Sequence, residues 1–249
     1  MIRPVALEPG EDVITLGRAF GTPIVVKGWT WLPLTQLVTW LILSWIGGKR
    51  QPERAITKRL GTGGLCMSVM LGSEWAHNLA HAAAANMTGK NMDALRITWG
   101  MPMVVYHQIA DPNVSPDEHI TRALGGPVIN SILLALSVFL RLFTKPGSTS
   151  RSLADTGLGT NSFLIGAGLL PMPFFDGGAI MKWSLVKNGR TPSQADNLVR
   201  KANAGTGAIL SIASIVALKK KQWFFGGLLG MLAGLSISVA SGLLSEKPS

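Results

Sequence analysis

The stretch Ser73-Glu74-Trp75-Ala76-His77-Asn78-Leu79-Ala80-His81 decides the fold, because it places two histidines inside a long apolar run. His77 and His81 are four residues apart, so on a helix they lie one turn apart on the same face. Two imidazoles in this geometry can hold one zinc ion. The stretch therefore predicts a buried helix that carries two metal ligands.

The residue after the first histidine is Asn78, whereas the zinc-protease motif H-E-x-x-H has a glutamate there that takes a proton from the metal-bound water. A side-chain amide has no proton-accepting group near neutral pH, so the general base of that motif is missing. Asn78 is instead a candidate to orient a water molecule or a peptide carbonyl in the metal cavity.

Glu74 lies near the same helical face, three residues before His77 and four before Asn78. Four roles stay open for its carboxylate: a hydrogen bond to a liganding histidine, a substitute base, a metal ligand, or an unrelated structural pairing. The Cα atoms of Glu74 and Asn78 are about one helical turn apart along the axis, which argues against simple replacement of the missing base.

The composition is that of a membrane protein. The 249 residues are 47% hydrophobic, and the mean hydropathy is +0.32. The net charge of +10 comes from basic residues between the apolar runs, which favours contact with the lipid bilayer and not with nucleic acid. The single cysteine, Cys66, excludes an internal disulfide. We expect neither a cleavable signal peptide nor an appended regulatory domain.

The pattern along the chain predicts an all-α polytopic membrane protein, with residues 1–249 forming a single integral-membrane domain that has a small interfacial β element. Strands are expected within residues 1–28, around a Gly-Thr-Pro turn, and again at 95–106. Basic, acidic and polar linkers are expected near 49–59, 111–118 and 188–201. About six transmembrane helices are predicted, at 29–46, 63–85, 123–143 (opening with Gly125-Gly126-Pro127), 158–171, 204–218 and 223–244.

Asp176 is the candidate for a third metal ligand. It follows an apolar run that Pro171 and Pro173 interrupt, and the two glycines after it allow close backbone packing. Unwound backbone at membrane depth is tolerated where it lines a buried cavity. Two imidazoles and one carboxylate, with a fourth position open to water, form a catalytic zinc shell.

Taken together, these segments resemble the site-2 protease family of intramembrane zinc metalloproteases, over residues 16 to about 185. Four segments carry the resemblance, and they occur in the order that the family has. Each alone is a weak signal, and the four in order form a strong one. They are LGRAFGTPI (16–24), HNLAH (77–81, for H-E-x-x-H), ALGGPVIN (123–130, for A-x-A-G-P-x-x-N) and LLPMPFFDGG (169–178, for the proline-rich aspartate-glycine motif).

The resemblance implies a site-2-protease-like core in which His77, His81 and Asp176 bind Zn²⁺. It also implies that the strands at 95–106 pair with the N-terminal strands near the entrance to the site. The expected partner is a membrane-embedded protein substrate or client. Basic residues are nearly balanced between the two sides, so the resemblance alone favours a cytosolic N-terminus for this multi-pass protein.

Two departures from the family pattern bear on catalysis: Asn78 replaces the catalytic glutamate, and Gly168 replaces the asparagine three residues before the first motif proline. General acid–base catalysis contributes roughly 10²–10⁴-fold to rates, so we expect a homologue that is impaired or silent in proteolysis. Such a pseudoprotease would bind membrane-protein helices without cleaving them.

Other functions stay open at this point. One is an active intramembrane metalloprotease with Glu74 as a relocated base. Another is a metal- or proton-coupled transporter, although no inverted repeat supports it. Histidine-box di-iron oxidases are excluded because four histidines are too few, and we expect His107 and His119 to be interfacial residues, not ligands. The sequence does not indicate an oligomeric state.

Overall fold

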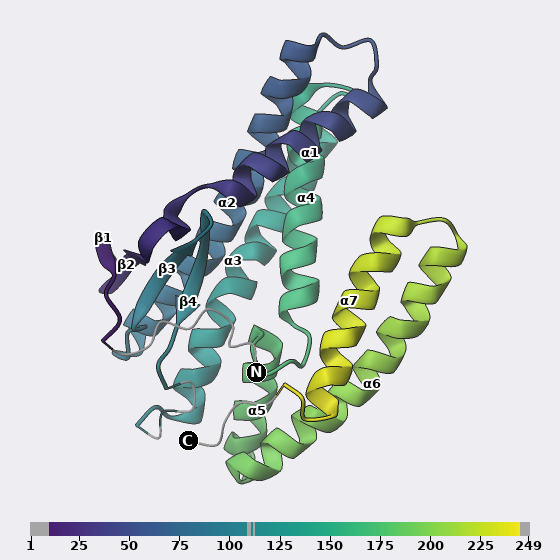
Figure 1. Cartoon of the computed structure of the whole chain (residues 1–249). Helices are drawn as coiled ribbons and strands as arrows, with labels where there is room; N and C mark the ends of the chain where they lie inside the picture. Colours follow the sequence, from purple (N-terminus) through teal and green to yellow (C-terminus); the bar gives the residue numbers. More distant parts are fainter. Residues whose placement is uncertain (1–9, 109–110, 112, 245–249) are drawn as a thin grey trace. The chain divides into compact units, whose positions relative to one another are not determined.

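The computed structural model describes residues 10–108, 111 and 113–244. Helices dominate, and a single small sheet accompanies them in this described part (Figure 1). The chain divides into two compact units. The first is built from residues 1–111 and 124–165, and the second from residues 112–123 and 166–249. The single integral-membrane domain stays a prediction.

The sheet confirms the strands predicted at both places. Its order is β1 (Ile14–Ala19), β2 (Thr22–Val26), β3 (Ala94–Thr98) and β4 (Met101–Val105). β2 pairs with β3 in parallel, which confirms that the later strands pair with the N-terminal ones, and the other two pairings are antiparallel. Each hairpin turns through two residues with positive φ, Phe20-Gly21 and Trp99-Gly100, as in the tight turns that match strand twist.

The sheet packs on the last turns of α2 (Ile56–Met87). Leu95 of β3 is fully buried against Ala82 and Ala85 of α2, and Met92 completes this core cluster. Small alanines on the helix let the sheet approach closely, and burying Leu95 alone contributes on the order of 2 kcal/mol. The core therefore fixes the helix just beyond His81.

Helix α1 (Leu34–Arg50), after the short η1 turn (Gly28–Trp31), packs along the first half of α2. The Trp40 indole donates a hydrogen bond to the Leu60 carbonyl oxygen at 2.8 Å. A Cβ on Gly63 would lie only 2.9 Å from the Ser44 backbone nitrogen. The glycine is thus what lets the two helices touch. Helix α2 starts at Ile56, so the expected basic linker is shorter than predicted.

Helices α2, α3 (Pro116–Leu142), α4 (Thr149–Gly168) and α6 (Pro192–Lys219) all begin well before the predicted spans, and capping explains the early starts of α3 and α6. Helix α3 starts at Pro116, so the motif expected to open it at 125–127 lies inside it. The Ser115 hydroxyl accepts from the Glu118 amide at 3.3 Å, and the Glu118 carboxylate accepts from the Ser115 amide at 2.6 Å. This reciprocal cap satisfies two amides that a helix otherwise leaves unpaired, which allows the polar acidic segment to be helical.

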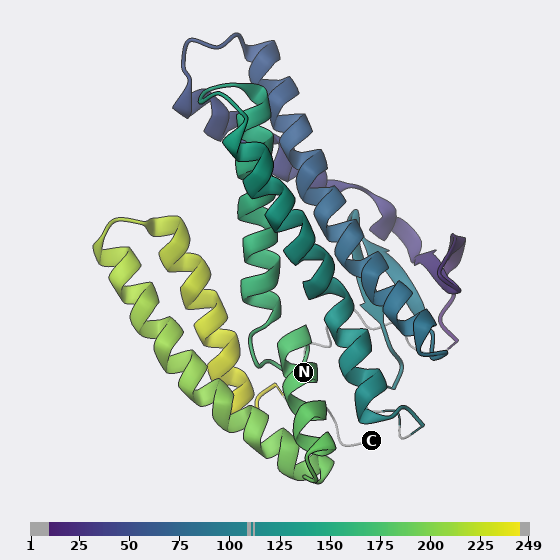
Figure 2. The same ribbon diagram turned by 180° about the vertical axis from the view of Figure 1, so that it is seen from behind.

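The expected polar linker at 188–201 is wrong for the same reason. After α4 (Thr149–Gly168) and α5 (Asp176–Lys187), helix α6 (Pro192–Lys219) begins at once, because Thr191 and Gln194 form a capping box with Pro192 in the first turn. Helix α7 (Trp223–Ala240) returns antiparallel to α6, as Figure 2 also shows.

Three helices, α3, α6 and α7, are long and apolar enough to cross a membrane. Their surfaces fit that environment, since Ile209 and Ile212 of α6 are 69% and 64% exposed. Membrane character is therefore supported. The spans expected in α1, α2 and α4 stay predictions, as do the total of six and the orientation of the chain.

Candidate metal centre

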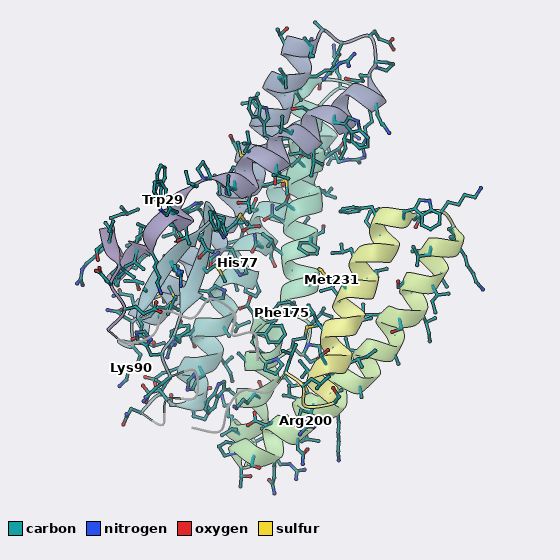
Figure 3. All side chains as sticks on the ribbon, viewed as in Figure 1. Trp29, His77, Lys90, Phe175, Arg200 and Met231 are labelled. Carbon is teal, nitrogen blue, oxygen red and sulfur yellow. The ribbon has the colours of Figure 1, made fainter. Side chains whose placement is uncertain are left out.

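The two histidines face each other on α2, as the spacing predicts. Their Nε2 atoms are 3.1 Å apart, and the two rings meet edge to face with centroids separated by 4.6 Å. Figure 3 labels His77 on this helix. Zinc–imidazole bonds of 2.0–2.1 Å in a tetrahedral shell place two ligand nitrogens about 3.3 Å apart. The pair therefore fits one tetrahedral zinc ion.

Two consecutive glycines bring α3 onto the histidine pair. A Cβ on Gly125 would lie 2.8 Å from the Ala80 carbonyl carbon and 2.9 Å from the His81 amide nitrogen. A Cβ on Gly126 would lie 2.6 Å from Nδ1 of His77, on the imidazole rings themselves. Both contacts are closer than real Cβ atoms make. Only glycine permits this approach, which explains the Gly-Gly of segment 123–130.

A chain of buried polar side chains supports the first histidine. The Asn130 side-chain oxygen lies against Nδ1 of His77, and its amide nitrogen donates to the Asn161 oxygen at 2.6 Å. The Asn161 nitrogen in turn is 3.2 Å from the Ser73 hydroxyl. Asn130 and Asn161 are 0% and 1% exposed, and Ser73 is buried. The chain thus runs from α2 through α4 and α3 back to α2.

The donor-to-acceptor direction of these side-chain hydrogen bonds is set at one end by a backbone group. The Asn161 side-chain nitrogen also donates to the Gly157 carbonyl oxygen at 2.7 Å, and a carbonyl can only accept. The Asn161 oxygen must therefore face Asn130, whose nitrogen donates to it. That leaves the Asn130 oxygen toward His77, so the proton of His77 lies on Nδ1. The lone pair of this ring is then on Nε2, the atom that faces His81.

Sequence reasoning included Asn130 only as part of a family-like segment, and it missed Asn161. The signal was present, because an asparagine in the middle of an apolar helix is costly unless a partner satisfies it. The sequence could not show which side chain would be that partner.

The Gly126 amide also lies 3.4 Å from Nδ1 of His81, so α3 contacts both histidines.

Asn78 and Glu74 are held very differently. The Asn78 amide donates to the Glu74 backbone carbonyl at 2.9 Å, a contact within its own helix. Among the residues that the structure describes, the half-buried Glu74 carboxylate makes no hydrogen bond or ion pair. The structure thus offers no support for a bond from Glu74 to a liganding histidine. The roles of Glu74 as a substitute base or as a metal ligand stay predictions.

Asp176 is the first residue of α5, in the second unit. The Asp-Gly-Gly turn folds tightly, since a Cβ on Gly177 would lie 2.7 Å from the Leu169 Cα. A Cβ on Gly168 would lie 3.5 Å from the Asp176 carboxylate, so a larger side chain there would reach that group. That Asp176 binds the same metal ion as the two histidines stays a prediction.

Among the described residues, the two other histidines do not belong to a group that could hold a metal. His119 is buried in the second unit, where its ring stacks on Trp183 with centroids 3.8 Å apart and planes at 3°. His107 is exposed, and its backbone amide donates to the Asp93 carboxylate at 2.8 Å. His119 is therefore a packing residue and not the interfacial side chain that the sequence suggested.

Comparisons with known proteins point to one group. No family model matches the chain. Over 87 residues the chain is 37% identical to a protein of Methanocaldococcus jannaschii that is provisionally named zinc metalloprotease MJ0611; the match covers 35% of this chain and 44% of that relative's length. The solved structure of a site-2 protease from the same organism matches 96% of this chain and 99% of its own, with a TM-score of 0.52 and 12% identity, a likeness that concerns the fold.

Proposed function

We propose that the chain is a homologue of the site-2 protease family and a zinc-binding membrane protein in which proteolysis is impaired or silent. One observation carries the proposal: the histidine pair keeps its full structural support, while the position of the general base holds Asn78, whose amide bonds to its own helix. A protein that kept binding without hydrolysis would show this combination.

In this proposal His77 and His81 each bind the zinc through one ring nitrogen, and Asp176 adds the third ligand. Each of the three offers one ligand atom of a kind that zinc prefers. When bound, the ion would act as a Lewis acid toward a water molecule or a peptide carbonyl. Asn130 keeps the proton of His77 on Nδ1, and Gly126 leaves room for both rings.

We further propose a multi-pass arrangement of about six spans with a cytosolic N-terminus. The clients would be membrane-embedded helices, which the protein binds between its own helices. Three apolar helices and the shared fold support the membrane setting. An extended client segment can also add as a strand to an exposed sheet edge, and the described sheet ends in β1 and β4.

A second candidate function is an active intramembrane metalloprotease with Glu74 as the base. It is favoured by one observation, that the Glu74 carboxylate makes no hydrogen bond or ion pair within the described residues and so is free to accept a proton. Its position one turn from Asn78 requires the substrate to sit differently from that in an H-E-x-x-H site.

The test measures zinc content and cleavage of a transmembrane peptide together, on the natural protein and on Asn78→Glu, Glu74→Gln and His77→Ala. We expect about one zinc per chain, no cleavage, and cleavage gained in Asn78→Glu. Cleavage by the natural protein that Glu74→Gln abolishes, with zinc retained, would establish the second candidate instead. Absence of zinc from the natural protein would contradict both.

A further inference from the structure

A cavity of about 260 Å³ that is lined in part by arginines lies within the first unit, at the opposite end of α2 from the histidines. It is formed by the last two turns of α1, the first turns of α2 and α4, and residues of the α1–α2 and α3–α4 connections. Figures 1 and 2 show the α1–α2 and α3–α4 connections side by side at this end of the unit. Four arginines contribute to its lining: Arg50, Arg54, Arg59 and Arg151.

The charge of this cavity is strongly positive. Its one acidic lining residue within the described structure is Asp155, which pairs with Arg141 at 2.6 Å and with Arg151 at 3.4 Å. Arg54 and Arg59 donate only to backbone carbonyls in the described structure, which bring no negative charge. The positive charge of these guanidinium groups is thus left without a matching anion.

Arg50 is the clearest case. It is the last residue of α1, it lines the cavity, and its guanidinium makes no hydrogen bond or ion pair within the described residues. A guanidinium carries five donor hydrogens in a planar fork that matches the oxygens of a phosphate group. Arg50 therefore has its full set of donors available for a ligand.

The lining also includes three apolar side chains, those of Leu43, Ile46 and Cys66. The cavity also lies where a candidate membrane span ends. Arg141 is in the last turn of α3, and its Nε bonds to Asp155 on the cavity lining. The end of a span is the depth at which lipid headgroups lie. A lining that combines guanidinium groups with apolar side chains matches the chemistry of a phospholipid at that depth.

We propose that this cavity binds a phosphate group, and that in the membrane its occupant is the headgroup of an anionic phospholipid. The arginines bind the phosphate oxygens, and the side chains of Leu43 and Ile46 contact the glycerol and the first acyl carbons. The site is separate from the metal centre, so it stands or falls independently of the proposed zinc function.

The test uses the full-length protein in detergent and measures retained lipid by native mass spectrometry during titration with phosphatidylglycerol or phosphatidylcholine. A parallel arm titrates inorganic phosphate alone. We expect one phosphatidylglycerol to bind more tightly than phosphatidylcholine. Loss of one charge-assisted contact in Arg50→Gln should weaken that binding about tenfold, and charge reversal in Arg50→Glu should weaken it further.

Lys58→Gln is the matched control, because Lys58 is an exposed basic residue of the same segment that does not line the cavity. It should leave the affinity within about twofold of the natural protein's. Equal weakening by Lys58→Gln and Arg50→Gln, or equal affinity for the two lipids, would overturn the proposal in favour of diffuse surface charge. Arg50-dependent binding of inorganic phosphate without lipid binding would assign the site to a soluble anion. Circular dichroism of each variant verifies that the helices remain folded.

Discussion

Two adjacent rows of side chains on α2 are built in opposite ways. In the row 73–77–81, Ser73 and His77 reach the amides of Asn161 and Asn130, and His81 lies against the Gly126 amide. In the neighbouring row 74–78, the one side-chain bond within the described residues stays inside the helix. Helices α3 and α4 thus hold the row 73–77–81 in place, and they give the row 74–78 no comparable support.

The difference teaches which part of the site the fold specifies. A ligand needs its ring fixed to within a fraction of an ångström, and contacts from other helices supply that. A general base needs a defined position as well, and neither Glu74 nor Asn78 receives one from another helix in the described structure. This contrast agrees with a protein that retains metal binding more strictly than hydrolysis.

The largest effect is expected for a substitution in α3 that displaces the histidines of the row 73–77–81. Gly126→Ala places a methyl group on both imidazoles, so we expect loss of zinc binding and destabilisation of about 1–3 kcal/mol. Metal analysis and thermal unfolding measure the two effects. Gly72→Ala is the matched control, since a Cβ there meets nothing within 4 Å. Full zinc occupancy in Gly126→Ala would show that α3 does not press on the histidines as described.

A second prediction tests whether the hydrogen-bonded side chains from Ser73 to His77 affect zinc affinity separately from the stability of the fold. Asn130→Ala removes the group that holds the proton of His77, and we expect zinc affinity to fall about 10–100-fold. Asn161→Ala should weaken zinc in the same direction but less, because it acts through Asn130. Competition with a chelator of known affinity gives both values.

The control for these variants is Asn203→Ala. Asn203 is also a fully buried asparagine, and it bonds to Ser236 at 2.9 Å within the second unit. Its removal should lower the unfolding temperature by a similar amount while zinc affinity stays unchanged. If all three variants lower zinc affinity equally, the chain from Ser73 to His77 has no special role in holding the metal.

The smallest effects are expected in the unsupported row. Asn78→Ala loses only a hydrogen bond to its own helix and gains helix propensity, so stability should change by less than about 0.5 kcal/mol. Glu74→Gln removes a half-buried charge without an ion partner in the described structure, and it should not lower stability. Zinc content should be natural in both. A large loss of zinc in Glu74→Gln would identify Glu74 as a ligand.

The sequence located the histidine pair correctly because the spacing of four residues and the period of the helix are both local properties. It also located the strands of the sheet. It misplaced the starts of α3 and α6, since the reciprocal caps of Ser115 with Glu118 and of Thr191 with Gln194 were not recognised in polar segments. Those errors were local and could have been avoided by searching for capping boxes.

What the sequence by itself determined is the set of candidate groups: two imidazoles one turn apart, an aspartate that follows a proline-interrupted apolar run, and an amide in place of a base. What only the tertiary structure decided is how His77 is protonated and how closely α3 approaches it. Both depend on residues more than forty positions away in the sequence, Gly126, Asn130 and Asn161. Helical periodicity states which way a side chain points, whereas a hydrogen-bond partner on another helix is fixed only when the helices pack.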